Sequence, residues 1–283
     1  MGKTWSQAQA KGATTLILSS EHFWPLTGPA QDRLATALQS RRAEISVLAY
    51  RRPQADVWRA LLVQQAKSFR IKLDEPIWGE VSYIGRSLAS RALFYGACLS
   101  RFRRQFGLVD AQLYQRRSFP GGNVVASFAD RVGISTLPGL TLSLEAEANR
   151  SLGWKGVALS IAIAEQNSRA IGSRLHRAAL ITAAATMARC HEDDTWIGRR
   201  PNFLTADDIA AINHLYAEDT VKLSKRFFGG SQPFQPAAAA PVDPFGPAHL
   251  GAGELVEAMS LYRRALIIEA PTVALTSLRR ITE

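Results

Sequence analysis

The feature that most constrains the fold is a strand, helix, strand pattern within the first fifty residues. Two short apolar runs, residues 14–18 (TTLIL) and 45–50 (ISVLAY), have the β-rich composition of strands that are buried in parallel sheets. Between them, residues 29–42 carry Leu34 and Leu38 at helical spacing and read as an amphipathic helix. This is a βαβ unit, so the sequence predicts an α/β fold with a parallel sheet that binds ligands at the carboxyl ends of its strands.

Charged and polar side chains follow both predicted strands. Residues 19–22, which include Glu21 and His22, follow the first strand, and Arg51 and Arg52 follow the second. Because the carboxyl ends of parallel strands lie at one edge of a sheet, we expect these groups on the same ligand edge. The alternatives are a polar strand end at the surface and a solvated pair of arginines.

The rest of the chain is mostly helical in pattern. A third strand is expected at residues 110–116, ending in the pair Arg116 and Arg117, which are read first as surface charges. Helices are predicted at residues 55–67, 87–105, 123–132, 155–166, 176–188 and 206–227, the last with Thr205 as its N-cap.

The C-terminal part divides by composition. Residues 229–253 contain five prolines and an alanine run and read as a linker outside any core. Residues 254–269 form a final amphipathic helix, which Pro271 is expected to stop. The expected organisation is an α/β domain over residues 1–228, the linker, and a helix with its tail over residues 254–283.

Charge points to an anionic ligand. Among the 283 residues, Lys and Arg outnumber Asp and Glu by 34 to 24, a net charge of +10, and most of the cations are arginines. The planar guanidinium suits phosphate, sulfate and carboxylate groups. Nucleic-acid binding is disfavoured because the basic positions lack interleaved aromatic residues and a recognised motif.

The cysteines and histidines do not form a metal-binding pattern. Cys98 and Cys190 are far apart and belong to no CxxC spacing, so we expect buried thiols in a reducing compartment. The run at residues 190–194 (CHEDD) lacks a second ligand cluster, so no metal is expected. The absence of an 18-residue apolar run and of a signal-peptide core makes the cytoplasm the expected location.

Several segments, taken in order, resemble a bacterial group of sulfotransferase-like proteins. The segments are LILSSEHF, ISVLAYRRPQADVWRALLVQQAKS, LSRFRRQFG, LYQRRSFPGGNVVASFADRVGI, NRSLGWKGVALSI and FLTADDIAAINHLYAEDTVKLSKRFFGG. The resemblance covers roughly residues 14–230. It implies a three-layer parallel sheet related to nucleotide kinases, truncated at the N-terminus, with a largely helical C-terminal half.

The resemblance implies transfer of a sulfuryl group from 3'-phosphoadenosine 5'-phosphosulfate to a hydroxyl of a carbohydrate or small molecule. Glu21 or His22 corresponds to the general base, and Arg51 to the arginine that binds the 3'-phosphate, with Arg52 as the alternative register. Arg59 stands where the family has a serine on the same phosphate.

Two readings of this resemblance remain. The loop that wraps the 5'-phosphosulfate in the family is expected to be missing before residue 14, which leaves either a sulfotransferase or a catalytically inactive relative that binds anions or a partner protein. The same loss is expected to leave an open sheet edge, covered by another copy, by a partner, or by the helix at residues 254–269.

Overall fold

The structure is a computed structural model, and it describes residues 7, 10–12, 15–18, 28–39, 44–69, 93–134, 151–166, 174–234 and 241–282. The fold is mixed α/β and largely helical. Its helices are α2 (Gly28–Gln39), α3 (Gln54–Lys67), α6 (Tyr95–Phe106), α7 (Val124–Arg131), α8 (Trp154–Gln166), α9 (Arg174–Cys190), α10 (Ala206–Phe227) and α11 (Ala252–Thr282). Among the described residues, single-turn 3₁₀ helices lie at Arg116–Ser118, Pro120–Gly122 and Pro247–His249.

The sheet of the described residues has two parallel strands. Strand β1 (Ser46–Arg51) pairs with β2 (Leu108–Leu113) in a register that places Ser46 opposite Leu108 and Arg51 opposite Leu113. The predictions of a strand at residues 45–50 and of parallel pairing are confirmed, and the third predicted strand forms about two residues earlier than expected. Strand β2 follows β1 by way of α3 and α6, as parallel pairing requires a long crossover.

The prediction of a strand at residues 14–18 is wrong for residues 15–18, the part that the structure describes. Residues 15–18 are irregular, and Leu16, Ile17 and Leu18 are exposed. An apolar run becomes a strand only when a neighbouring strand pairs with its backbone groups. Among the described residues, the partner of β1 is β2 and not this run. The βαβ unit expected from residues 14–50 is therefore not the unit that builds this sheet.

Local sequence signals explain several helix boundaries. Asn123 caps α7 by accepting hydrogen bonds from the amides of Val125 and Ala126. Thr205 and Asp208 form a reciprocal capping box at the start of α10, whose bounds agree with the prediction. Helix α6 ends at Gly107, whose φ of +80° is a conformation that glycine adopts at little cost and that turns the chain directly into β2.

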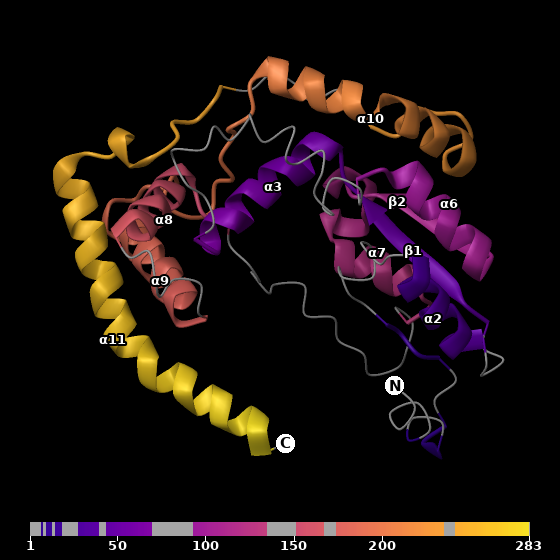
Figure 1. Cartoon of the computed structure of the whole chain (residues 1–283), viewed down its shortest axis with the longest axis horizontal. Helices are drawn as coiled ribbons and strands as arrows, with labels where there is room; N and C mark the ends of the chain where they lie inside the picture. Colours follow the sequence, from indigo (N-terminus) through magenta and orange to yellow (C-terminus); the bar gives the residue numbers. More distant parts are fainter. Residues whose placement is uncertain are drawn as a thin grey trace.

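Helix α3 is shared by two hydrophobic cores. Ala55 and Trp58, in its first turns, pack into a core with β1, β2, α6 and α10. Leu62 and Ala66, near its C-terminal end, pack into a second core with α8, α9 and α11. Figure 1 shows α3 lying between the strands and the group formed by α8, α9 and α11. The position of the β1 carboxyl end relative to the helical part therefore depends on one helix.

Helices α6 and α10 are joined by a buried carboxylate. Asp219 of α10, which is 4% exposed, accepts hydrogen bonds from the backbone amides of Gly96 at 2.7 Å and Ala97 at 2.8 Å. These amides belong to the first turn of α6, where no preceding carbonyl is available to them. Burial raises the pKa of Asp219, while the two amide hydrogen bonds lower it in part.

Two expectations for the C-terminal segment need correction. Phe234 and Leu250, inside the predicted linker, are each less than 9% exposed and contribute to the two cores. Helix α11 extends from Ala252 to Thr282, so Pro271 does not stop it. It packs against α9 and α8, and among the described contacts it does not supply the expected cover for the sheet edge. None of the described helices is both long and apolar enough to cross a membrane.

Replacing Gly96 by alanine tests the close approach of α6 and α10. A Cβ at this position would lie 2.7 Å from the backbone oxygen of Asp219 and 3.0 Å from the backbone nitrogen of Leu223. Because neither backbone atom can turn away, Gly96→Ala should lower the free energy of unfolding by about 1–3 kcal/mol, measured by urea denaturation. The matched control is Gly253→Ala in α11, where a Cβ meets nothing within 4 Å. It should be neutral or slightly stabilising, and an equal loss in both variants would contradict the packing.

Candidate functional site

The candidate site lies where β1 ends and α3 begins. Strand β1 ends at Arg51, and Pro53 precedes the first residue of α3, so Arg52 stands in a two-residue connection. A cavity of about 310 Å³ opens at this point. It is lined by Tyr50, Arg51, Arg52, Val57, Ala60, Leu93, Tyr95 and Tyr114. A helix N-terminus beside two guanidinium groups is an environment that favours a bound anion.

Arg51 is the half-buried cation of this site. Its guanidinium carbon lies 5.3 Å from the centre of the Tyr95 ring. Burial lowers the pKa of Arg51 to about 10, while electrostatic interaction with Tyr95 and Cys98 opposes this shift in part. Burial also raises the pKa of Tyr95, so its phenol stays protonated at neutral pH. Because this guanidinium is partly removed from water, its attraction to a bound anion is stronger than that of a fully solvated arginine.

Arg52 is held by aromatic side chains. Its guanidinium carbon lies 3.9 Å from the centre of the Tyr114 ring, which follows β2 directly. Tyr114 and Tyr50 both pack edge to face on Phe119, with ring centres 5.4 and 5.7 Å apart. The Tyr50 hydroxyl is 3.1 Å from the Ser127 hydroxyl of α7. The stacked position fixes the plane of Arg52 next to the cavity.

Two further arginines extend the positive charge along α3. Arg59 donates one hydrogen bond from Nη1 to Asp56 at 3.0 Å, while its Nε and Nη2 are buried and have no hydrogen-bond partner among the described residues. Desolvation and then the positive charge of Arg52 lower the pKa of Arg200, with Arg59 adding to the shift and Asp56 opposing it. Asp56 thus interacts with both Arg59 and Arg200, and Arg52 adds a further positive charge next to Arg200.

The positive charge continues to the far end of α3. Burial, together with the charges of Arg177 and Arg200, lowers the pKa of Lys67, the last residue of the helix. Apart from Asp56, the neighbours that shift the pKa values of Arg200 and Lys67 are arginines and Tyr114.

The structure brings together the predicted anion-binding residues but cannot place the predicted base. Arg51, Arg52 and Arg59 all lie at or beside the cavity end of α3. Glu21 and His22 lie outside the described residues. The lining of the cavity contains no Asp, Glu or His, so these described residues can bind and orient an anion but supply no general base.

The sequence reasoning missed Tyr95, Tyr114 and Arg200 as members of the site. Tyr114 falls inside the predicted third strand, and its place beside Arg52 follows once that strand is paired with β1. Arg200 lies in the segment between α9 and α10, and no pattern in the sequence connects it with β1.

The other polar groups considered in the sequence have structural contacts. Arg117 is exposed and donates to Gln115 at 3.2 Å. In the 190–194 run, Asp193 accepts from Lys155 at 2.7 Å and from the Thr195 amide at 2.9 Å. In the described part of the chain, no three His, Cys, Asp or Glu residues come together as metal ligands would.

The expectation that both thiols are buried is half correct. Cys98 is buried, and burial raises the pKa of its thiol, whereas Cys190 is exposed at the end of α9.

Arg51→Met separates a binding role for this arginine from a structural one. Because desolvation disfavours the charged form of Arg51, removing it should leave the free energy of unfolding unchanged or raise it by about 1–2 kcal/mol at pH 7, measured by thermal denaturation. The control is Arg131→Met, which removes an exposed ion pair with Asp110 and should change stability by less than about 1 kcal/mol. A fall of several degrees for Arg51→Met alone would show that the arginine stabilises the fold.

The chain matches no protein-family model, and no curated protein and no solved structure proved similar to it. The arrangement of its own residues is therefore what indicates its chemistry.

Proposed function

We propose that this chain is a sulfotransferase-like protein that binds the 3'-phosphate of 3'-phosphoadenosine 5'-phosphosulfate at the arginine edge of β1. The observation that carries the proposal is the cavity of about 310 Å³ between the carboxyl end of β1 and the start of α3, with Arg51 and Arg52 in its lining. A phosphate dianion matches this charge, and the helix start adds backbone donors. The proposal includes the three-layer, nucleotide-kinase-like fold, of which the two parallel strands would form part.

The residues fit the nucleotide in distinct roles. Arg51 and Arg52 would hold the 3'-phosphate, and the buried Nη2 of Arg59, which lacks a described partner, would be a further donor. Tyr114 lies flat against Arg52 and would limit how far the ribose can move. Bound in this way, the nucleotide supplies an activated sulfuryl group, which an acceptor hydroxyl attacks as its own proton passes to a base.

Glu21 or His22 is the proposed base. In the transfer, a bond forms between the acceptor oxygen and sulfur, the bond from sulfur to the nucleotide phosphate breaks, and the proton leaves the acceptor oxygen. The acceptor is a hydroxyl of a carbohydrate or small molecule.

A second function, an anion-binding module without catalysis, is favoured by one observation. The described lining of the cavity has arginines and tyrosines but no carboxylate or imidazole to accept a proton. Such a module would bind phosphate or sulfate groups of several ligands with similar affinity.

Isothermal titration with adenosine 3',5'-bisphosphate tests the nucleotide site. We expect saturable heat from the intact chain, and at least tenfold weaker binding for Arg51→Ala or Arg52→Ala, because each removes a charge-assisted contact worth about 1.5–3 kcal/mol. Arg104→Ala, an exposed arginine of α6, is the matched control for net charge. Absence of heat, or heat that is unchanged in both site variants, would exclude the nucleotide assignment.

Adenosine 5'-monophosphate and inorganic sulfate separate the two functions in the same titration. A nucleotide site that recognises the 3'-phosphate should bind adenosine 5'-monophosphate at least tenfold more weakly than the bisphosphate. Equal affinities for all three ligands would favour the general anion module.

Glu21→Gln and His22→Gln test the proposed base. If one of these residues accepts the proton, its variant should lose about 10²–10⁴-fold in the rate of labelled sulfuryl transfer to a panel of monosaccharides and disaccharides, while nucleotide affinity stays unchanged. A rate unaffected in both variants would reject both residues as the base.

A further inference from the structure

The outer edge of β2 presents backbone groups that the rest of the described chain does not use. The Tyr114 amide donates to the carbonyl of Arg51, which shows that the even-numbered residues of this strand direct their backbone groups toward β1. Val109 and Ala111 must therefore direct theirs away from β1. Among the described residues, no group is hydrogen-bonded to them on that side.

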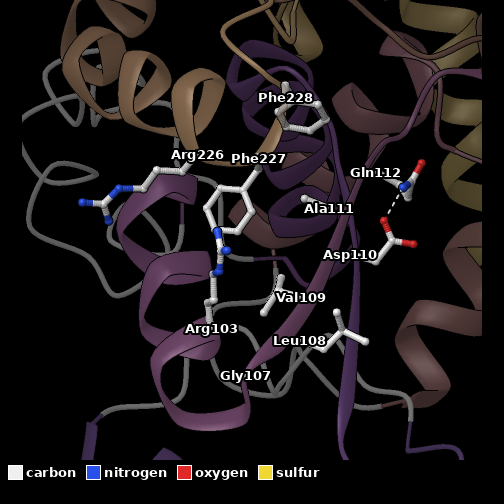
Figure 2. A pocket seen from close by; sticks show the side chains of 10 residues that line it. All are labelled: Arg103, Gly107, Leu108, Val109, Asp110, Ala111, Gln112, Arg226, Phe227 and Phe228. Atoms are coloured by element: carbon white, nitrogen blue, oxygen red, sulfur yellow. Dashed lines mark hydrogen bonds between the residues drawn. The ribbon is translucent and has the colours of Figure 1, made fainter.

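A cavity of about 420 Å³ runs along this same edge. One side is β2 from Leu108 to Gln112, and the other is formed by the C-terminal ends of α6 and α10. Figure 2 shows Arg103 of α6 extending toward Phe227, with Phe228 above the strand. The cavity thus combines an open strand edge, two aromatic rings and room for an additional chain.

The charges along this edge are positive. Arg103 lies over Phe227, 6.0 Å from its ring centre, and Arg226 donates to the Ser100 hydroxyl at 2.7 Å. Neither arginine has a carboxylate partner among the described residues. Asp110 does not neutralise them, because its side chain is engaged by Arg131 at 2.6 Å and by Gln112.

These charges disfavour a second copy of the chain as the occupant. Pairing two β2 edges would bring the arginines of both copies toward one another, in a protein whose net charge is already +10. Like charges at an interface oppose association, whereas acidic side chains on an added strand would pair with them. An added strand also uses the outward amides and carbonyls, which a small anion alone would leave unpaired.

We propose that the free edge of β2 binds an extended acidic segment of a partner protein as an additional strand, with its backbone on Val109 and Ala111 and its carboxylates near Arg103 and Arg226. This site is separate from the arginine site at the end of β1 and does not depend on the proposed nucleotide binding.

The probe is a fluorescein-labelled peptide of eight residues in which glutamate and valine alternate. Fluorescence anisotropy should show saturable binding to the intact chain. Arg103→Glu should weaken this binding about fivefold or more. The control Arg104→Glu changes the next residue of α6, which is also exposed, and should weaken binding less. A peptide in which lysine replaces glutamate should not bind. Equal weakening by both glutamate variants would show that only net charge is sensed and would overturn the proposal.

Backbone pairing is tested with a second peptide of the same sequence whose alternate amides are N-methylated, in the two alternating patterns. Loss of binding in one pattern is expected, because methylation removes the donors that face β2. Amide exchange measured by NMR should slow at Val109 and Ala111 when the unmethylated peptide is added and should change less at Asp110 and Gln112. Binding that survives both methylation patterns, or no protection at Val109 and Ala111, would overturn strand addition. Concentration-dependent dimerisation that the peptide does not reverse would identify a second copy as the occupant and would also overturn it.

Discussion

The arrangement of the whole molecule depends on α3 being buried at both of its ends. Trp58 near the N-terminal end and Ala66 near the C-terminal end pack into different cores, so the helix cannot shift without opening one of them. Removing apolar area of this kind from water is the main favourable contribution to folding. Because only two residues separate β1 from α3, the same packing fixes the direction of the helix start and the position of Arg51 and Arg52.

The second constraint is the contact between α6 and α10. Asp219 provides the two acceptors that the first turn of α6 lacks, and Gly96 lets the two backbones approach closely enough for it to do so. Helix α6 leads through Gly107 into β2, so this contact also sets where β2 pairs with β1. The contact between α6 and α10 thus positions β2, both where it pairs with β1 and along its outer edge.

The proposed arginine site carries a desolvation cost. Arg51 is desolvated enough to lower its pKa to about 10, and the described groups that shift it are a tyrosine and a thiol that remain protonated at neutral pH. Desolvation of this charge opposes folding, and the proposed anion would offset part of that cost. Arg52 and Arg59 each lie close enough to Arg200 to repel it, and a bound dianion would relieve this repulsion.

The sequence by itself determined the elements whose signals are local. The capping pair Thr205 and Asp208 set the start of α10, the apolar run before Arg51 became β1, and Arg51 and Arg52 line the cavity where this strand ends. Local signals failed at residues 15–18, because a strand needs a partner, and at Pro271, which lies within α11. The tertiary structure was needed to place Arg200 near Arg52, to let Asp219 cap α6, and to leave the outer edge of β2 without a partner strand among the described residues. These contacts join residues far apart in the chain, and the free energy that selects them comes from burial shared among many side chains, which no single stretch of sequence carries.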